Sequence, residues 1–541
     1  MNRNSARRNG NGLFALTLML MFFIGLSALS AQTITGTISD SQGPLPGASV
    51  VVEGTTLGTT SDFDGKYSIE APADATTLIF SYVGYATQEI PIDGQSVIDV
   101  TLSEDAQALS EVVVVGYGTQ RKSDLTGAVG SIDAVDIVKQ PIVSPDQVLA
   151  GTLSGVNITN RSGDPGAPIS VNIRGIGTLS ADSNPLYVID GIPVVGTNNI
   201  TVNTSSTTDS NPLASINPSD IATIDVLKDA ASAAIYGARG ANGVIIITTK
   251  KGSATDPMVT YDGYTSTASA RETLDVLNTE QYITIQDELG RDFSQFSGDP
   301  TIDWQDAIFK NGFIQNHNVG VSGGGEKGTY YISGSYLENE GIQRAQSFER
   351  FSLRANSEVK VGNRLKFGES LQISQTDRLT QSEGALNAGF GAALNAPFFN
   401  IFGDGPLGYN PSNPDTRGEA TGTSNLVQLT DLRVNSTTIQ NRKVLGYFYG
   451  ELEIIDNLKL RPSVGIDYNV GSGDFFQAET TLNGGLSTRQ SLLVQSRPIE
   501  LTLTTGATLS YDKTFGDHNF GALVGVEQTK FRFNKVRLQG R

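Results

Sequence analysis

Apolar and polar residues alternate over long segments in the second half of the chain. Residues 351–361 alternate over eleven positions, and residues 458–470 do so over thirteen. Strands of this length can cross a lipid bilayer at a tilt, and the alternation gives each strand one apolar and one polar face. The pattern predicts antiparallel transmembrane strands, with a soluble β-sandwich of long strands as the alternative.

The connections between these segments are of two lengths. Short turns are expected at residues 362–363, 456–457 and 516–517, whereas residues 376–435 make a separation of about sixty residues. Short turns at one end of a sheet and long loops at the other are typical of outer-membrane β-barrels. The asymmetry therefore favours membrane strands over the soluble alternative.

The segment from 185 to 252 is rich in apolar strands. Residues 186–189 and 192–194 predict two strands joined at residues 190–191, because Asp-Gly is a strong hairpin signal. Residues 244–249 predict a further, fully apolar strand. Strands as apolar as these cannot stand in water unaided, so we expect a large surrounding structure.

Two short helices are predicted in the same region. One is expected over residues 145–153. Asp229 should cap the other, an Ala-rich helix over residues 230–236 that ends at Gly237, since Asp favours the N-cap and Gly the left-handed residue after a helix. With the strands, these helices predict an α+β domain over residues 123–252.

The part of the chain before this domain is predicted to be all β. About seven short strands are expected between residues 33 and 102, at the spacing of a β-sandwich. An acidic linker follows, and then four consecutive valines at residues 112–115. A strand-prone segment beside a flexible linker invites pairing with another protein, and the alternative is that it forms the last strand of the sandwich.

The first 31 residues predict a signal peptide. Three arginines precede an apolar run over residues 13–26, and small residues follow, so that cleavage after Ser30 or Ala31 is expected. The alternative is an N-terminal anchor helix, but the run is short for a bilayer span. Later segments of the sequence are too polar for a transmembrane helix, so a membrane location would require a barrel.

Composition excludes several kinds of site. The chain has no cysteine, which rules out disulfides and thiolate zinc sites, and its two histidines, His317 and His518, are expected to be structural or exposed. A formal net charge of -18 argues against nucleic acid as a partner, because phosphate binding needs a basic face.

Three motifs that resemble chemical sites have simpler interpretations. Residues 320–324 match the G-x-S-x-G nucleophile elbow, but the strand predicted at 329–335 stands where the elbow needs a helix. Residues 175–177 lack the third glycine of a dinucleotide fingerprint. Asp62, Asp64 and Glu70 are close in sequence, but an Asp-Gly turn explains them better than a calcium site. We therefore expect no catalytic residue, no metal site and no cofactor.

Several stretches resemble known protein families. Asp64, Gly65 and Tyr67, with Tyr82 and Tyr85, resemble carboxypeptidase-regulatory-like, transthyretin-related sandwiches. Residues 186–194 and 216–252 resemble the plug of SusC/RagA-type TonB-dependent outer-membrane transporters of Bacteroidetes-like bacteria, and residues 303–306, 315–318 and 329–334 resemble the opening of their barrel. The resemblance extends from residue 33 to the end of the chain.

The resemblance implies a mainly β protein with five parts. They are a signal peptide (1–31), a carboxypeptidase-regulatory-like β-sandwich (32–103), a linker with a TonB box (104–122), an α+β TonB-dependent receptor plug (123–252) and an incomplete antiparallel transmembrane β-barrel (253–541).

The resemblance also implies two groups of site residues. By position, the TonB box would be Glu111, Val112, Val113, Val114 and Val115. The plug motif would comprise Tyr187, Asp190, Gly191, Asp229, Tyr236, Gly237, Arg239, Gly240, Asn242 and Gly243.

Members of this family import bulky nutrients across the outer membrane, powered through TonB and usually with a SusD-like lipoprotein as a lid. The resemblance therefore implies a glycan or peptide ligand. A surface adhesin is the alternative, and a siderophore or vitamin receptor is less favoured. The substrate is not specified: Phe390, Phe398, Phe399 and Tyr409 suit either sugar stacking or packing of a long loop.

The number of barrel strands departs from the family. Roughly ten candidate strands occur between residues 258 and 541, fewer than half of the ~22 in a large transporter barrel. The chain also ends without an aromatic-tipped final strand. We expect an open sheet and an N-terminal portion of a longer protein, and a closed small barrel around the plug would contradict this expectation.

Overall fold

The structure is a computed structural model of the 541-residue chain. It describes residues 32–541 except 41–42, 54, 56, 73–74, 83–84, 86–87, 104–111, 116–117, 122–128, 138–141, 161, 176–182, 195–198, 201–207, 210, 381–394, 399, 404–407, 410–424, 426, 428–430, 434, 479, 483–486, 490, 517 and 541. The predicted signal peptide and Glu111 lie outside the described residues. The chain forms two compact units, one of residues up to 112 with 121–124, the other of residues 113–120 and 125–541.

Seven short strands build the sandwich of the first unit, as predicted. One sheet has the order β4 (Lys66–Ala71), β1 (Gln32–Ser39), β7 (Val100–Thr101), and the other has the order β3 (Gly58–Thr60), β2 (Ser49–Val52), β5 (Thr77–Ser81), β6 (Gln88–Pro91). Alternate residues of each strand point between the sheets, so that Ile34, Leu78 and Phe80 are fully buried. The sandwich thus has an apolar core of its own.

The four valines form a strand that belongs to neither sandwich sheet. Strand β8 (Val112–Val115) pairs with β9 (Gly118–Arg121) in a separate two-stranded sheet. The alternative expectation, that these valines complete the sandwich, is wrong for the described sheets, because neither includes β8.

A five-stranded sheet forms the centre of residues 129–249, which we call the central domain. Its order is β10 (Val129–Asp133), β17 (Ile221–Leu227), β18 (Val244–Thr249), β13 (Leu186–Ile189), β14 (Ile192–Val194). The predicted hairpin between β13 and β14 is present, and the apolar strand β18 lies in the middle of the sheet, where Ile245 and Ile247 are fully buried. Two further pairs of strands lie outside this sheet, β11 (Val156–Asn160) with β12 (Ile169–Ile173) and β15 (Asn199–Ile200) with β16 (Thr208–Asp209).

The helices of the central domain are short, and the one expected over residues 145–153 ends at Leu149. They are α2 (Ala134–Ile137), η2 (Pro145–Leu149), η3 (Pro218–Asp220), α3 (Ala230–Ala233) and η4 (Ala234–Gly240). The Ala-rich segment becomes 3-10 helical after Ala233, and Gly237 interrupts it with φ 61° and ψ −148°, a conformation that only glycine adopts without strain. Asp229 occupies the N-cap position, but its side chain forms no cap hydrogen bond and instead pairs with Arg174.

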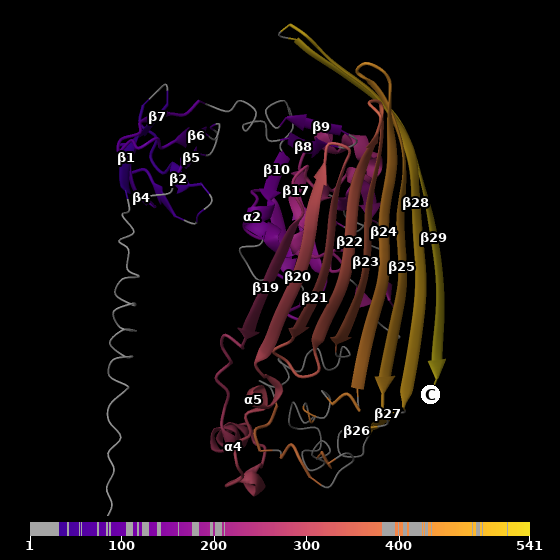
Figure 1. The fold of residues 1–541 in the computed structure, drawn as a ribbon. Coiled ribbons are helices and arrows are strands. Elements are labelled where there is room, and N and C mark those ends of the chain that lie inside the picture. Colours follow the sequence, from indigo (N-terminus) through magenta and orange to yellow (C-terminus); the bar gives the residue numbers. More distant parts are fainter. Residues whose placement is uncertain are drawn as a thin grey trace, which may run out of the picture. The chain divides into compact units, whose positions relative to one another are not determined.

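Nine antiparallel strands form one large sheet in chain order. They are β19 (Met258–Ala268), β20 (Gly312–Gly325), β21 (Gly328–Glu340), β22 (Ser347–Val361), β23 (Leu365–Thr380), β24 (Asn435–Ile455), β25 (Leu458–Gln477), β28 (Leu492–Phe515) and β29 (His518–Gly540). Figure 1 shows them curving around the central domain. Strands β19 and β29 remain as the two edges, so the sheet is open, as expected.

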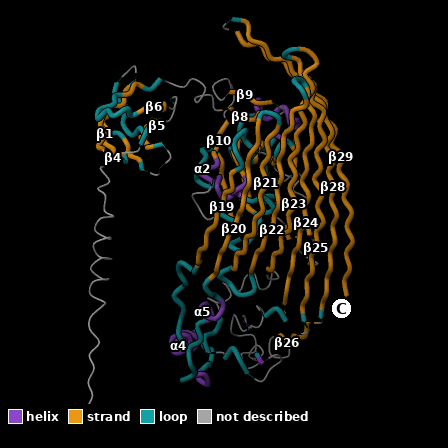
Figure 2. Tube along the Cα trace, in the orientation of Figure 1, coloured by secondary structure: helices purple, strands orange, loops and turns teal. Residues whose placement is uncertain are grey.

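The two ends of this sheet differ (Figure 2). Short turns at residues 362–363 and 456–457 lie at one end, as predicted, and β28 and β29 pair as far as Phe515 and His518 at this end. The other end carries the longer connections, with α4 (Thr279–Glu288), η5 (Ser294–Phe296), α5 (Trp304–Ile308) and the pair β26 (Thr480–Leu482) and β27 (Ser487–Arg489). In the described part of the chain, no helix is both long and apolar enough to span a membrane.

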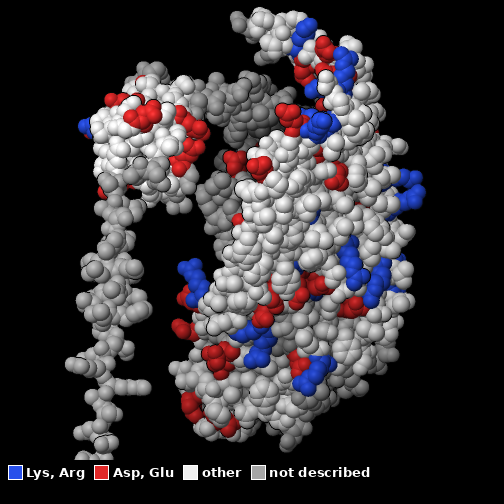
Figure 3. All heavy atoms as spheres, in the orientation of Figure 1, with Lys and Arg blue, Asp and Glu red and all other residues white. Residues whose placement is uncertain are grey.

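The two faces of the nine-stranded sheet have opposite character. On β22, Phe351 and Leu353 are 51% and 46% exposed, whereas the residues between and beside them, Arg350, Ser352 and Arg354, are buried against the central domain. Figure 3 shows charged side chains towards both ends of the strands, with a largely uncharged stretch between them. An apolar outer face over a polar inner face is the distribution expected of a strand that crosses a membrane.

Candidate functional site

The candidate site is the junction between the central domain and the inner face of the nine-stranded sheet. Asp190, in the turn between β13 and β14, is one of its charged groups. Its carboxylate accepts hydrogen bonds from Thr249 N at 3.0 Å and Thr249 Oγ1 at 2.8 Å within the central domain, and from Ser370 Oγ on β23 at 2.7 Å. One carboxylate therefore links the β13–β14 hairpin, the end of β18 and the sheet.

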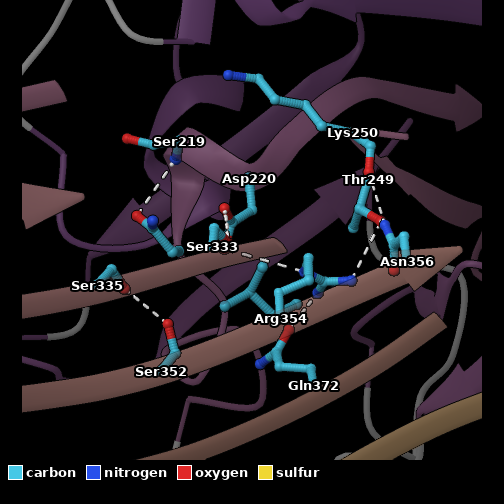
Figure 4. A network of polar contacts seen from close by, with 12 residues as sticks. Ser219, Asp220, Thr249, Lys250, Ser333, Ser335, Ser352, Arg354, Asn356 and Gln372 are labelled. Atoms are coloured by element: carbon cyan, nitrogen blue, oxygen red, sulfur yellow. Dashed lines mark hydrogen bonds and ion pairs between the residues drawn. The ribbon is translucent and has the colours of Figure 1, made fainter. Parts of the chain in front are cut away.

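Arg354 on β22 is the positive charge at this junction. Its side chain is 1% exposed and lies 3.1 Å from Asp190 Oδ2 and 3.9 Å from Asp220 Oδ2. Figure 4 shows the guanidinium directed towards Thr249, whose Oγ1 accepts from Arg354 Nη1 at 3.1 Å, and towards Gln372 on β23, whose side-chain oxygen accepts from Nη2. A buried guanidinium between two carboxylates, one in the β13–β14 turn and one at the end of η3, ties both segments to the sheet.

Asp220 joins the start of β17 to β21. Its Oδ1 accepts from Tyr331 Oη at 2.9 Å and from Ser333 Oγ at 2.6 Å. Its backbone oxygen accepts from Lys250 N at 2.8 Å, which holds the end of β18 beside it. Asn356 on β22 completes the contact, because its Nδ2 donates to Lys250 O at 2.6 Å (Figure 4).

Arg350 holds the central domain through its backbone. Its side chain is almost fully buried, and Nη1 donates to the carbonyl oxygens of Val143, Ala214 and Ile216 at 2.8, 3.1 and 2.8 Å. These carbonyls come from the segment before η2 and from the segment before η3, which one side chain therefore connects. Each bond is charge-assisted and is stronger than a neutral hydrogen bond.

A further ion pair lies at the loop end of the sheet. Asp164, between β11 and β12, is buried and pairs with Arg378 on β23. Thr380 Oγ1, at the last residue of β23, donates to the same carboxylate at 2.6 Å. The ring of Phe348 on β22 packs against Gly166 in the same connection. This part of the central domain is thus attached to the strand that leads into the longest connection of the sheet.

Much of the junction is polar, although apolar clusters also join the two parts, such as Ile200 with Phe475 and Val494. The inner face of the sheet contributes buried polar side chains, among them Asn316, Asn318, Ser335, Ser352 and Ser374. Ion pairs and hydrogen bonds exchange for bonds to water at moderate net cost, whereas separating an apolar interface exposes it to water at about 25 cal/mol per Å². The polar contacts of the junction are therefore ones that water can replace if the two parts separate, whereas the smaller apolar clusters are not.

The structure separates the predicted plug-motif residues into several places. Asp190 and Gly191 form the turn at the junction, and Tyr187 and Tyr236 are buried in the apolar cores. Asp229 pairs with Arg174, Asn242 Nδ2 donates to Asn184 O at 3.4 Å, and Arg239 pairs with Glu527 on β29 at 3.0 Å. Gly237, Gly240 and Gly243 lie in and just after η4, before β18. Asp190, Gly191 and Arg239 thus contact the nine-stranded sheet, whereas the other plug-motif residues lie within the central domain.

Sequence reasoning missed the two arginines that bind the central domain. Arg350 and Arg354 lie on β22, whose alternation was recognised, at positions that face the central domain. An arginine at two inward positions of one membrane strand is a signal that was available, because a buried charge needs a partner. Asp164 and Asp220 carried no such signal, since their surroundings come from distant segments.

The loop aromatics that fall within the described residues pack against other loops. Phe398 is 4% exposed and its ring lies 4.2 Å from that of Phe296, and Tyr409 is 9% exposed and packs with Trp304. Phe398 and Tyr409 therefore agree with the expectation that these aromatic residues pack a long loop, rather than with the expectation that they stack on sugar rings. Phe390 and Phe399 lie outside the described residues.

Catalytic chemistry finds no support at the motifs considered. Ser322 of the G-x-S-x-G sequence lies inside β20, which a tight turn joins to β21, so the elbow's helix is missing at this place. His317 stacks on Tyr261 and shares a 2.7 Å hydrogen bond with its hydroxyl. Among the described residues, no group of three metal-ligating side chains is close enough to hold an ion.

Two family models match the first half of the chain. The CarboxypepD_reg-like domain matches residues 34–114, and the TonB-dependent Receptor Plug Domain matches residues 121–244. The second match covers most of the central domain, including the turn at Asp190.

Curated relatives match almost the whole chain. TonB-dependent receptor P3 of Formosa agariphila is 34% identical, covering 98% of this chain and 51% of that protein. TonB-dependent receptor SusC of Bacteroides thetaiotaomicron is 30% identical, covering 97% of this chain and 53% of that protein. The chain therefore spans about half the length of the curated relatives it matches.

The fold also has solved counterparts. A structure described as the RagAB peptide importer in the 'open-open' state superposes with a TM-score of 0.65 at 22% identity, covering 79% of this chain and 50% of that one. A second structure of the RagAB peptide transporter gives a TM-score of 0.62 at 23% identity, covering 76% and 48%. The likeness shows that this chain shares their fold over about half of their length.

Proposed function

Since the chain belongs to the SusC-like TonB-dependent receptors, we propose that it is an outer-membrane active transporter that imports bulky nutrients in a TonB-energised process. The observation that carries the proposal is the pairing of an apolar outer face with a polar, charge-linked junction to the central domain. The outer face suits lipid, and the junction suits a domain that moves within an aqueous lumen. On this proposal the central domain is the plug.

The plug would move when force is applied at its N-terminal side. We propose Glu111, Val112, Val113, Val114 and Val115 as the TonB box, a role supported by their place before the central domain and by the strand β8. An extended segment binds a partner by adding a strand to its sheet, and main-chain pairing of that kind resists a pull along the chain. The contacts of Arg354 and Arg350 would then be the ones that the pull must break.

Membership of the family also suggests the class of cargo and a lipoprotein partner. We propose oligosaccharides or peptides as cargo and a SusD-like lipoprotein as the partner at the loop end of the sheet. By the usual orientation of such barrels, the short turns at residues 362–363 and 456–457 face the periplasm and the long connections face the outside. Asp164 and Arg378 would lie at the side from which the cargo enters.

Deletion of residues 111–115 tests the transport proposal. Cells that produce the protein without these residues should lose uptake of the glycans or peptides that the unaltered protein imports, while the amount of protein in the outer membrane stays the same. Deletion of residues 104–108, five residues of the same linker, is the matched control and should leave uptake in place. Equal uptake with and without residues 111–115 would refute energised transport.

A further inference from the structure

The outer face of strands β22 to β25 is left uncovered by the rest of the described chain. These strands lie inside the sheet, each with a hydrogen-bonded strand on both sides. Val359, Phe367, Phe448 and Val464 point outwards and are between 39% and 51% exposed. Any strand added at the edges β19 or β29 would extend the sheet sideways without covering this face. Whatever contacts it must come from outside the barrel.

This face contains a hollow of about 450 Å³. Its walls are the rings of Phe367 and Phe448 and the side chains of Val359 and Val464. Small or short residues keep it open, among them Gly450, where an added Cβ would lie 3.4 Å from the Phe367 ring. The hollow is therefore a cavity with mainly apolar walls on a face that meets lipid.

One carboxylate lies in this apolar setting. Glu369 on β23 stands opposite Ser357 on β22 and Phe448 on β24. Ser357 Oγ donates to its Oε1 at 3.0 Å, and among the described residues no lysine, arginine or histidine lies within ion-pair distance of it. A charged group on a lipid-facing surface is costly unless an opposite charge compensates it. The described part of the chain supplies a hydrogen bond here but no positive charge.

The depth of Glu369 limits what can supply that charge. It is the fifth residue of β23, roughly 13 Å along the strand from the short-turn end, and the tilt of a membrane strand reduces that distance in depth. A lipid headgroup near the membrane surface on this side is therefore within reach of the carboxylate.

We propose that the hollow binds a phospholipid with a primary ammonium headgroup, of the phosphatidylethanolamine kind. One acyl chain lies between Phe367 and Phe448, and the ammonium group pairs with Glu369, to which it offers three hydrogen-bond donors. The inference rests on the outer-membrane location of the proposed function, because a soluble protein would not meet such a lipid.

Native mass spectrometry of the detergent-solubilised protein tests the site. The protein is titrated with phosphatidylethanolamine or with phosphatidylglycerol of the same acyl chains. The protein should retain phosphatidylethanolamine about fivefold more strongly, the size of one partly exposed ion pair. E369Q should abolish this preference, and G450L, which fills the hollow, should weaken retention of the ethanolamine lipid. E349Q, an outward carboxylate on β22 opposite Asp377 and outside the hollow, is the matched control and should keep the preference.

Three results would overturn the site. They are equal retention of the two lipids by the unaltered protein, a preference that survives in E369Q, and a polypeptide that occupies the hollow in place of lipid. The first comparison needs no variant, so it stands even if a substitution impairs folding. If the protein imports its cargo but shows no lipid preference, the lipid site is refuted and the transport proposal is not. If the protein shows the lipid preference but imports no cargo, the transport proposal is refuted and the lipid site is not.

Discussion

At the scale of residues, the junction depends on charges that are buried and compensated. Arg354 and Arg350 are each at most 2% exposed, so water cannot replace a partner that is removed while the domain stays in place. Exposed pairs behave differently, since water already solvates both groups. The contribution of an ion pair in this protein therefore depends on which face of the sheet carries it.

Replacing Arg354 tests this difference. R354A leaves Asp190 and Asp220 without their cation and should reduce the free energy of unfolding by about 3–5 kcal/mol. R364A removes the exposed pair with Asp456 and should cost about 0–1 kcal/mol. Urea unfolding of the folded protein in detergent measures both. Equal losses in the two variants would show that the Arg354 cluster does not anchor the central domain.

The sandwich contains a titratable group whose protonation affects stability. Burial, and secondarily the charge of Asp99, raises the pKa of Tyr67 to about 12. Its hydroxyl donates to Ile98 O at 2.8 Å, which needs the neutral form. Because the folded pKa lies above the unfolded value of about 10, the neutral tyrosine stabilises the fold below pH ~10 and this contribution is lost as the pH rises towards 12.

Y67F should remove this alkaline dependence. Between pH 9 and pH 12, the unaltered sandwich should lose stability more steeply than the variant. An ultraviolet titration of the variant should lack the one tyrosine whose pKa is about 12 in the unaltered protein. Urea unfolding at a series of pH values makes the comparison. Parallel curves for the two proteins would mean that Tyr67 ionises as freely in the fold as in the unfolded chain.

At the scale of elements, strands were predictable because their signal is local. The alternation at residues 351–361 and 458–470 and the Asp-Gly turn at 190–191 each specify an element within one short segment. The helical segment expected over residues 230–236 is present and Gly237 interrupts it, as expected, but its 3-10 geometry after Ala233 and the pairing of Asp229 with Arg174 depend on the surrounding domain. The junction itself could not be predicted, because Arg354 and Asp220 are 134 positions apart and meet only in the fold.

The connection between the central domain and β19 passes close to β21. An added Cβ at Gly252 would lie 2.3 Å from both the nitrogen and the oxygen of Tyr330, and backbone atoms cannot turn away as a side chain can. G252A should therefore destabilise the protein by about 1–3 kcal/mol. G325A, at the end of β20, meets no atom within 4 Å and is the matched control.

Thermal unfolding in detergent checks this pair of variants. G252A should unfold at a lower temperature than the unaltered protein, and G325A should unfold close to it. An unchanged unfolding temperature for G252A would mean that the connection is free to move away from Tyr330.

At the scale of the whole molecule, the proposed transport requires the central domain to move against the sheet so that cargo can pass. The chain has no cysteine, so an engineered pair gives a single defined cross-link. Asp220 and Ser333 are in hydrogen-bond contact across the junction, at 2.6 Å between Oδ1 and Oγ. Ser335 and Ser352 are in similar contact within the sheet, at 2.7 Å between their hydroxyl oxygens.

Uptake by cells that carry one or the other of these cysteine pairs tests whether the central domain moves during import. The pair D220C and S333C should block import of a glycan or peptide when oxidised and recover it when a reductant is added, because the disulfide joins the central domain to β21. The pair S335C and S352C joins only β21 to β22 and should import its cargo in both states. Continued import through the oxidised first pair would contradict the account, since cargo would then pass without movement of the central domain.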